Sequence, residues 1–329
     1  MRILLLGFGA VGQSFAELLD SEAQTLASDY GLGPRIVGIV DSRGAVLDPD
    51  GVDVRAALAS KRKSRTLEAT DAKLYRAGMT GTEAIREVDC EVVVEATPTN
   101  LDSGEPGLSH VRAAMGRGRH VICTNKGPLA IAMPALMELA RHNDVVFKFS
   151  GTVGGGTPVL DLAKRCLEGS RIVSVSGILN GTSNYVLTRM FSEGTSMDEA
   201  LRDAQQLGYA EADPTYDIGG FDTACKLVIL SIKDVSIKGI TGVTRESVEK
   251  AKLNGRTIKL VGRMARTATV APEEIPTTHP LNVSGTYNAV TFDTHPAGEI
   301  TIVGKGAGGK ETASSVIRDL IEIRRSFAR

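Results

Sequence analysis

Four acids and a lysine lie between Gly208 and Lys226, in the sequence GYAEADPTYDIGGFDTACK. Asp222 and Lys226 stand four residues apart where a helix is predicted to begin, so their side chains share one helix face. An acid and an amine held that close can position a hydroxyl and move its proton. Glu211 and Asp217 lie on the preceding loop, where carboxylates suit an ammonium group. The same spacing is also typical of an exposed helix salt bridge, so this segment alone leaves both interpretations open.

A second group, at the start of the chain, predicts dinucleotide binding. The apolar strand Arg2–Leu6 is followed by GFGAVG and then by an amphipathic run, which is the strand, glycine turn and helix that the fingerprint requires. Its glycines permit a tight turn, a close approach to the pyrophosphate and close packing of the helix. The helix N-terminus offers N–H groups to the phosphates. The predicted cofactor contacts in this turn are Gly7, Phe8, Gly9, Val11 and Gly12.

The end of the second strand bears on the choice between NAD and NADP. Asp41 closes the predicted strand Arg35–Asp41, where a carboxylate can accept hydrogen bonds from a ribose 2′-hydroxyl, which favours NAD. Arg43 follows two residues later and can instead hold a 2′-phosphate. The basic run at residues 61–63 is interpreted as a solvated charged turn. The sequence therefore leaves the choice of NAD or NADP open.

Composition narrows the functional class. A length of 329 residues suits about two domains, and a net charge of −1 without a basic stripe argues against nucleic acid as a partner. No apolar run approaches the ~20 residues of a membrane span. The four cysteines are scattered without a CxxC motif, which predicts thiols in a reducing cytoplasm. With five histidines and no cysteine cluster, a zinc site is not expected.

The order of elements predicts an α/β fold. Apolar strands alternate with helices up to about residue 148, which predicts a Rossmann-type, doubly wound parallel sheet. Thr97 and Lys126 fall at the carboxyl ends of such strands, where ligands of these sheets bind. A glycine-rich joint, GTVGGGTP, follows at Gly151. Beyond it, β segments at residues 258–271 and 281–292 predict an α+β domain with an antiparallel or mixed sheet.

Taken together, these motifs resemble homoserine dehydrogenase. They occur in order through nearly the whole chain: GFGAVG at Gly7, EATPTN at Glu95, TNKGP at Thr124, GTVGGGTP at Gly151, GILNGTSNYVLTRM at Gly177, GYAEADPTYDIGGFDTACK at Gly208, HPL at His279 and GKGAG at Gly304. The resemblance implies NAD(P)-dependent interconversion of L-homoserine and L-aspartate 4-semialdehyde, a step in threonine, methionine and isoleucine biosynthesis. It also implies the short form, in which the regulatory ACT extension of some members is not expected.

The resemblance implies a domain plan and a role for each matching residue. Residues 1–150 form the NAD(P)-binding domain, a helix at about 307–329 packs back on it, and residues 151–306 bind substrate and form a homodimer through their sheet. The implied catalytic residues are Lys226, which moves the proton, its partner Asp222, and Lys126 near the nicotinamide. The implied substrate ligands are Glu211, Asp217 and Asp222, and the further cofactor contacts are Thr97, Lys126 and Gly306. The family's sodium ion would be held by the backbone carbonyls of Val153, Gly155 and Thr157, with Ser150 where the family often has Glu.

Two other functions compete with this prediction. An acylating semialdehyde dehydrogenase needs an activated cysteine, for which Cys123 is the only tempting position, although no histidine motif surrounds it. Such an enzyme would lose all activity on thiol alkylation. A non-catalytic NAD(P)-binding regulator would keep GFGAVG but would not need Asp222 and Lys226 beside a substrate-sized cleft. A turnover assay with homoserine separates this alternative from an enzyme.

Overall fold

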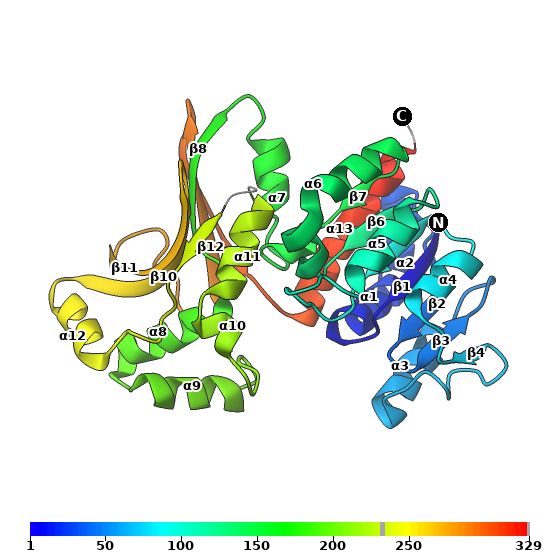
Figure 1. The fold of residues 1–329 in the computed structure, drawn as a ribbon, viewed down its shortest axis with the longest axis horizontal. Coiled ribbons are helices and arrows are strands. Elements are labelled where there is room, and N and C mark those ends of the chain that lie inside the picture. Colours follow the sequence, from blue (N-terminus) through cyan, green and yellow to red (C-terminus); the bar gives the residue numbers. More distant parts are fainter. Residues whose placement is uncertain (231–233, 328–329) are drawn as a thin grey trace. The chain divides into compact units, whose positions relative to one another are not determined.

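The computed structural model describes residues 1–230 and 234–327, and the chain divides into two compact units. The first unit joins Met1–Thr152 to the residues from Gly308 onward, and the second unit is Val153–Ala307 (Figure 1). The last two residues of the predicted helix at 307–329 lie outside the described residues.

The first unit is built on a seven-stranded sheet with the strand order β4-β3-β2-β1-β5-β6-β7. The strands are β1 (Arg2–Leu6), β2 (Arg35–Asp41), β3 (Gly44–Leu47), β4 (Tyr75–Ala77), β5 (Val92–Glu95), β6 (His120–Cys123) and β7 (Phe147–Lys148). From β2 to β7 all neighbours run parallel, as predicted. The predicted doubly wound parallel sheet is confirmed, and it carries an addition at one edge, where β3 pairs antiparallel with β2 and β4 pairs antiparallel with β3. Only two residues separate β2 from β3, and so short a connection joins antiparallel strands.

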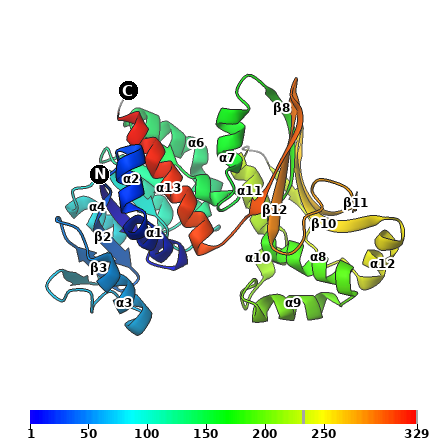
Figure 2. The ribbon, with the colours of Figure 1, turned by 180° about the vertical axis from the view of Figure 1, so that it is seen from behind.

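Helices cover both faces of this sheet. They are α1 (Ala10–Ser21), α2 (Ala23–Tyr30), α3 (Val54–Ser64), α4 (Gly81–Glu87), α5 (Gly107–Met115), α6 (Lys126–His142) and α13 (Gly309–Ser326). Figure 2 shows α13, from the far end of the chain, beside α1. Its buried stripe of Ala313, Val316, Leu320 and Ile323 recurs at helical spacing and belongs to the same core as Ile3 of β1. The C-terminal helix thereby closes the core of the nucleotide-binding fold.

The second unit contains a six-stranded mixed sheet with the order β13-β12-β8-β10-β11-β9. Its strands are β8 (Arg171–Ile178), β9 (Val235–Ile237), β10 (Arg256–Met264), β11 (Ala268–Pro276), β12 (Tyr287–His295) and β13 (Gly298–Lys305). Neighbours are antiparallel except β9 and β11, which confirms the prediction of a mixed sheet. The predicted β segment at 281–292 is wrong in its first half, because residues 281–286 form a loop before β12.

Helices of the second unit bring the acidic segment against the sheet. They are α7 (Val159–Asp161), which continues as a π-helical turn (Leu162–Cys166), α8 (Gly181–Glu193), α9 (Met197–Gln206), α10 (Thr215–Ile218), α11 (Phe221–Leu230) and α12 (Arg245–Leu253). Helix α11 packs on β10 so closely that a Cβ at Gly262 would lie 3.1 Å from the side chains of Thr223 and Leu227. The predicted helix carrying Asp222 and Lys226 is therefore confirmed, and it is anchored through its apolar face.

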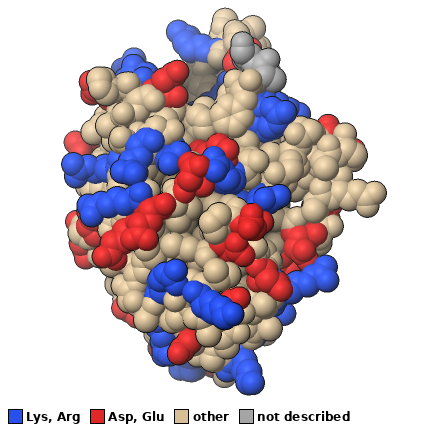
Figure 3. Space-filling model, turned by 90° about the vertical axis from the view of Figure 1, so that its right-hand side faces the viewer, with Lys and Arg blue, Asp and Glu red and all other residues tan. Residues whose placement is uncertain are grey.

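The surface carries charges of both signs. On the face in Figure 3, lysine and arginine side chains are interspersed with aspartate and glutamate, and the described residues there form no extended basic stripe. This mixture agrees with the net charge of −1. Within residues 1–230 and 234–327, none of the helices has the length and apolar character needed to cross a membrane.

Candidate active site

An acid and an amine meet at the first turn of α11. The Lys226 ammonium donates hydrogen bonds of 2.6 Å both to Asp222 Oδ2 and to the carbonyl oxygen of Leu179. Both side chains are shielded from solvent, with 7% of Lys226 and 15% of Asp222 exposed. The alternative of an exposed helix salt bridge is therefore wrong, since an ion pair held out of water is strongly oriented by its partners.

Asn180, which the sequence analysis did not single out, connects this pair to a second acid. Its amide nitrogen donates to Asp217 Oδ1 at 2.6 Å and to Asp222 Oδ2 at 2.8 Å. Its amide oxygen accepts the backbone N–H of Ser183 at 2.8 Å, which caps the N-terminus of α8. The only sequence signal was the N-cap pattern of an asparagine before a helix, which says nothing about contacts with residues further along the chain.

Asp217 is the acid whose ionisation the site disfavours most clearly. Burial raises the pKa of the Asp217 carboxyl, the negative charge of Asp222 raises it further, and the hydrogen bond from Asn180 opposes both. The predicted acids Asp217 and Asp222 and the predicted base Lys226 are thus brought together in one cluster. A cluster of two carboxylates and one ammonium carries one net negative charge when all three groups are ionised.

Glu211 lies apart from this cluster, on the exposed loop after α9. Its backbone carbonyl accepts a hydrogen bond of 3.1 Å from the Gln205 side chain, which fixes the base of the loop. The nearby carbonyl of Tyr209 accepts the Thr182 hydroxyl at 2.8 Å, so the loop is also fastened to the start of α8. The Glu211 side chain is therefore exposed on a loop whose backbone is tethered.

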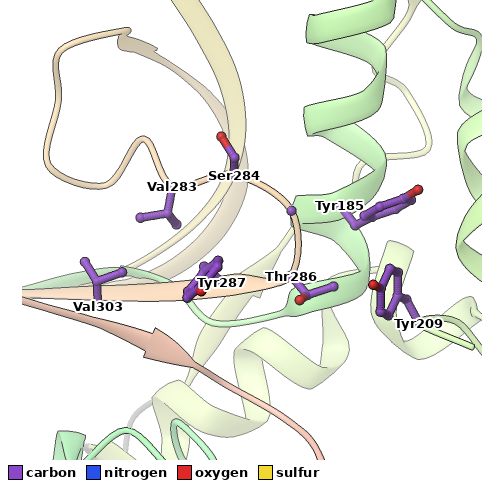
Figure 4. Close-up of a pocket in the computed structure, with 8 residues that line it drawn as sticks. Tyr185, Tyr209, Val283, Ser284, Thr286, Tyr287 and Val303 are labelled. Carbon is purple, nitrogen blue, oxygen red and sulfur yellow. The ribbon is translucent and has the colours of Figure 1, made fainter. Parts of the chain in front are cut away.

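A cavity of about 600 Å³ opens beside this loop. Figure 4 shows Tyr185 of α8 and Tyr209 on one side and the loop from Val283 to Tyr287 on the other, and the two tyrosine ring centres are 5.1 Å apart. The loop also covers the start of α8, because a Cβ at Gly181 would lie 3.0 Å from the Thr286 carbonyl oxygen. It therefore supports the backbone next to Asn180.

A buried lysine holds that loop in place. Lys259 donates to Asn184 Oδ1 at 2.9 Å, to Thr188 Oγ1 at 3.2 Å and to the Val283 carbonyl at 2.7 Å. Asn184 in turn donates to the carbonyl of Gly285 at 2.9 Å. Burial lowers the pKa of the Lys259 ammonium to about 8, because desolvation disfavours its charge.

The glycine turn after β1 fits a dinucleotide. Gly7 has a φ of +94°, and a Cβ there would lie 2.4 Å from the Ala96 carbonyl oxygen, while one at Gly12 would lie 2.1 Å from the Gly7 carbonyl oxygen. A Cβ at Gly9 would meet nothing within 4 Å among the described residues, so this is the side open to a pyrophosphate. Phe8 is only 2% exposed, which leaves its backbone as the part available to a cofactor.

The end of β2 departs from the predicted arrangement in one respect. Lys61 lies on α3, not in a solvated turn, and its ammonium donates to Asp41 Oδ2 at 2.7 Å. The Arg43 backbone N–H donates to Asp41 Oδ1 at 2.8 Å, while its side chain is exposed. The negative charge of Asp41 is thus partly compensated, and two cations flank the position predicted for the adenosine ribose.

A buried polar network, missed in the sequence, joins the ends of β5 and β6. Glu95 is fully buried and lies 2.7 Å from His110 Nδ1. Its other oxygen accepts the backbone N–H of Thr97 at 2.8 Å and also accepts the Thr97 hydroxyl. Asn125, the N-cap of α6, donates to Thr97 Oγ1 at 3.2 Å. Because α6 begins at Lys126, one network fixes the backbone beneath both predicted nicotinamide neighbours.

The glycine-rich joint packs against the returning loop at Gly306. A Cβ at Gly155 would lie 2.8 Å from the Gly306 carbonyl carbon, and one at Gly306 would lie 1.8 Å from Asn288 Nδ2. Neither polar atom of the buried Asn288 amide has a hydrogen-bond partner among the described residues. The carbonyl of Thr157 already accepts the Val159 N–H at 2.8 Å. The carbonyl oxygens of the joint and the amide oxygen of Asn288 are the type of ligand that a small, hard cation such as sodium prefers.

Cys123 does not suit nucleophilic catalysis. Cys123 is completely buried, its Sγ donates to the Asn125 carbonyl at 3.1 Å, and burial raises the pKa of its thiol well above the usual range. A thiol in that setting is not a thiolate nucleophile. The alternative of an acylating dehydrogenase built on Cys123 is therefore not supported.

Comparisons with known proteins point to one family. The family model described as homoserine dehydrogenase matches residues 158–321, and the model described as glutamate/leucine/phenylalanine/valine dehydrogenase matches residues 1–105. A homoserine dehydrogenase of Methanocaldococcus jannaschii is 42% identical over 336 residues, with 99% of each chain covered. An NAD(+)-dependent homoserine dehydrogenase of Pseudomonas canavaninivorans is 39% identical, covering 100% of this chain and 97% of the relative.

Solved structures agree with the sequence relatives. A homoserine dehydrogenase from Thiobacillus denitrificans superposes with a TM-score of 0.85 at 31% identity, covering 100% of this chain and 74% of that one. A hyperthermophilic archaeal homoserine dehydrogenase in complex with NADPH gives a TM-score of 0.87 at 28% identity, covering 99% of this chain and 98% of that one.

Proposed function

Because the chain belongs to the homoserine dehydrogenase family, we propose that Lys226 is the group that moves the substrate's hydroxyl proton and that Asp222 holds it in place. The protein is an NAD(P)-dependent oxidoreductase that interconverts L-homoserine and L-aspartate 4-semialdehyde in amino-acid biosynthesis. The observation that carries the proposal is the Lys226 ammonium, shielded from solvent and held at 2.6 Å by both Asp222 and the Leu179 carbonyl.

The substrate is a small zwitterion, so acids must face its ammonium. Asp217 and Glu211 take this role, the first from the buried cluster and the second from the tethered loop. Asp222 accepts hydrogen bonds from Lys226 and from Asn180, so its main role is to hold the lysine, and contact with the substrate is secondary. In the oxidation direction, the hydroxyl oxygen gives its proton to the neutral amine form of Lys226, which becomes the ammonium, as C4 loses a hydride to the bound nicotinamide cofactor. In the other direction the same group returns the proton.

The nucleotide unit supplies the cofactor site. NAD or NADP accepts the hydride from C4 when bound. The open side of the turn at Gly9 and the N-terminus of α1 suit the diphosphate, with Phe8 and Val11 contributing their backbone. Thr97 and Lys126 lie at the carboxyl ends of β5 and β6, where the nicotinamide half is expected.

Three further features belong to the same proposal. A sodium ion is held by the carbonyls of Val153, Gly155 and Thr157, beside the orphaned Asn288 amide; metal analysis of the purified protein by mass spectrometry tests it. The enzyme is a homodimer through the second unit, where β8 and β13 expose apolar side chains, including Val303 at 50% exposure; light scattering gives its mass. It works in the cytoplasm, where scattered thiols stay reduced.

The deciding experiment is turnover with L-homoserine, followed by the absorbance of the reduced nucleotide with NAD and with NADP. Wild-type protein is expected to turn over homoserine, and the Lys226→Ala variant to bind the cofactor but lose turnover. A Lys226 variant that is folded and retains more than half of the wild-type turnover overturns the assignment of the proton-transfer role.

A further inference from the structure

We propose that Asn180 is a positioning residue that holds Asp217 and Asp222 as a two-carboxylate clamp, so that Asp217 stays ionised to receive the ammonium of the substrate. The inference rests on the proposed roles of Asp217, Asp222 and Lys226. It assigns to Asn180 an electrostatic task in addition to its structural one as the N-cap of α8.

The geometry leaves the Asn180 amide one useful orientation. Its oxygen must face the Ser183 N–H, which is a donor, at 2.8 Å. Its nitrogen faces two carboxylate oxygens, on Asp217 at 2.6 Å and on Asp222 at 2.8 Å, which are acceptors when ionised. An amide nitrogen carries two hydrogens, so each carboxylate receives one. Every polar atom of the side chain is thereby used, and the spacing of the two acids is fixed by one rigid plane.

The backbone next to Asn180 completes the arrangement. The carbonyl of Leu179 accepts Lys226 at 2.6 Å, so two consecutive residues hold all three charged groups of the cluster. Asn180 is only 4% exposed, and its hydrogen bonds to charged groups are therefore shielded from competing water.

Charge balance explains why the residue that holds the two acids is neutral. Asp222 Oδ2 is shared by Lys226 and Asn180, so its charge is largely compensated within the protein. Asp217 receives the Asn180 amide but lacks a lysine of its own among its described hydrogen bonds. The negative charge that remains is located at Asp217, where an incoming ammonium can neutralise it.

The groups around Asp217 determine in which direction its pKa moves when Asn180 is replaced. Burial raises its pKa most, Asp222 raises it next, and the hydrogen bonds of Asn180 and Thr182 and the charge of Lys226 lower it. Removing the Asn180 donor therefore raises the pKa of Asp217 further. A hydrogen bond to a charged group corresponds to about one to two pH units of such a shift.

The experiment compares pH profiles of kcat/KM for homoserine in Asn180→Asp and Asn180→Ser. Both substitutions retain an oxygen that can cap α8, and both remove the amide donor. The acid limb is expected to move up by about one pH unit or more, so that kcat/KM at a pH on the wild-type acid limb falls about tenfold to a hundredfold. The Asp variant should shift further than the Ser variant, because it adds a third carboxylate.

Asn184→Asp is the matched control. It makes the same isosteric change one turn further along α8. Among the described hydrogen bonds, Asn184 contacts Lys259 and the loop carbonyls but none of Asp217, Asp222 and Lys226. Its acid limb is expected to stay at the wild-type pH whatever happens to its melting temperature. An Asn180 variant that loses activity equally at every pH has only a structural defect, and that result overturns the proposal.

Asp217→Asn provides a test that does not depend on the folding of the Asn180 variants. This isosteric change removes the group whose titration is invoked, and the acid limb is expected to disappear while KM for homoserine rises. An acid limb that persists in Asp217→Asn rules the clamp out. Homoserine turnover by wild-type protein is measured in parallel, because its absence would reject the proposed function itself and not Asn180 alone.

Discussion

Replacing Lys226 with methionine should separate catalysis from folding. The methionine chain has a similar length but neither accepts nor gives a proton. A general acid–base group contributes roughly 10²–10⁴-fold to the rate, which corresponds to about 3–5 kcal/mol of transition-state stabilisation. Cofactor affinity should change little, because Lys226 lies in the second unit and the glycine turn lies in the first.

The same substitution also removes the ammonium from a shielded ion pair. Asp222, only 15% exposed, would keep Asn180 but lose its cation. Leaving one member of a buried pair unpartnered costs about 3–5 kcal/mol, and the partial exposure of Asp222 places this case near the lower limit. The Leu179 carbonyl loses its donor as well. We therefore expect a loss of about 3 kcal/mol in the free energy of unfolding, in addition to the loss of turnover.

The double variant Lys226→Met/Asp222→Asn distinguishes the two effects. Because the second change removes the carboxylate whose lysine partner was lost, it should restore most of the stability measured by urea unfolding, yet turnover should stay at the level of the single variant. Turnover is followed by nucleotide absorbance, and cofactor binding by the fluorescence of the reduced nucleotide. Recovery of activity together with stability would refute the reasoning, since Lys226 would then act only as a structural cation.

Three other predictions follow from particular residues. Glu211→Gln should raise KM for homoserine about tenfold without lowering the melting temperature, because an exposed charge facing the ammonium is lost; a drop in melting temperature with unchanged KM would assign Glu211 to the loop. Arg43→Ala should raise the Kd of NADPH about tenfold to a hundredfold and the Kd of NADH little, and Asp41→Ser should weaken the binding of NADH more than that of NADPH. Equal increases in Kd for both nucleotides in Arg43→Ala would contradict this. Folded Lys259 releases its proton near pH 8, below its usual value of 10.5, so the unfolded state binds more protons between these values and stability should rise there. The rise, about 3 kcal/mol, should vanish in Lys259→Met when urea unfolding is compared at the two pH values, and an unchanged slope would count against it.

The features predictable from sequence were those determined by near neighbours. A glycine turn after an apolar strand has few conformations. The φ of +94° at Gly7, and the clash that a Cβ at Gly12 would make with the Gly7 carbonyl oxygen, are local reasons for those two glycines. The pairing of Asp222 with Lys226 follows from helix geometry alone. Both predictions needed only the residues within one or two turns.

The features that escaped prediction depend on contacts across the sequence. Asn180 meets Asp217 and Asp222 from 37 and 42 residues away, and no local pattern encodes that distance. Lys61 lies on α3 and reaches Asp41 across 20 residues, so the sequence around Lys61 gave no sign that its charge is paired. The β3–β4 edge was missed because strands of four and three residues are too short to show a periodicity.

In the proposed mechanism, the ammonium of the substrate supplies the cation that balances the remaining negative charge of the Asp217–Asp222–Lys226 cluster. Lys226 and Asp222 compensate one another, and the neutral side chain of Asn180, which donates to both Asp217 and Asp222, orients Asp217 without cancelling its charge. An alcohol without an amino group would leave Asp217 buried and unpaired, which its raised pKa already marks as unfavourable. An amino alcohol supplies the missing cation and, in the same step, brings a hydroxyl toward the lysine. Recognition of the ammonium and placement of the reacting oxygen are therefore one electrostatic event.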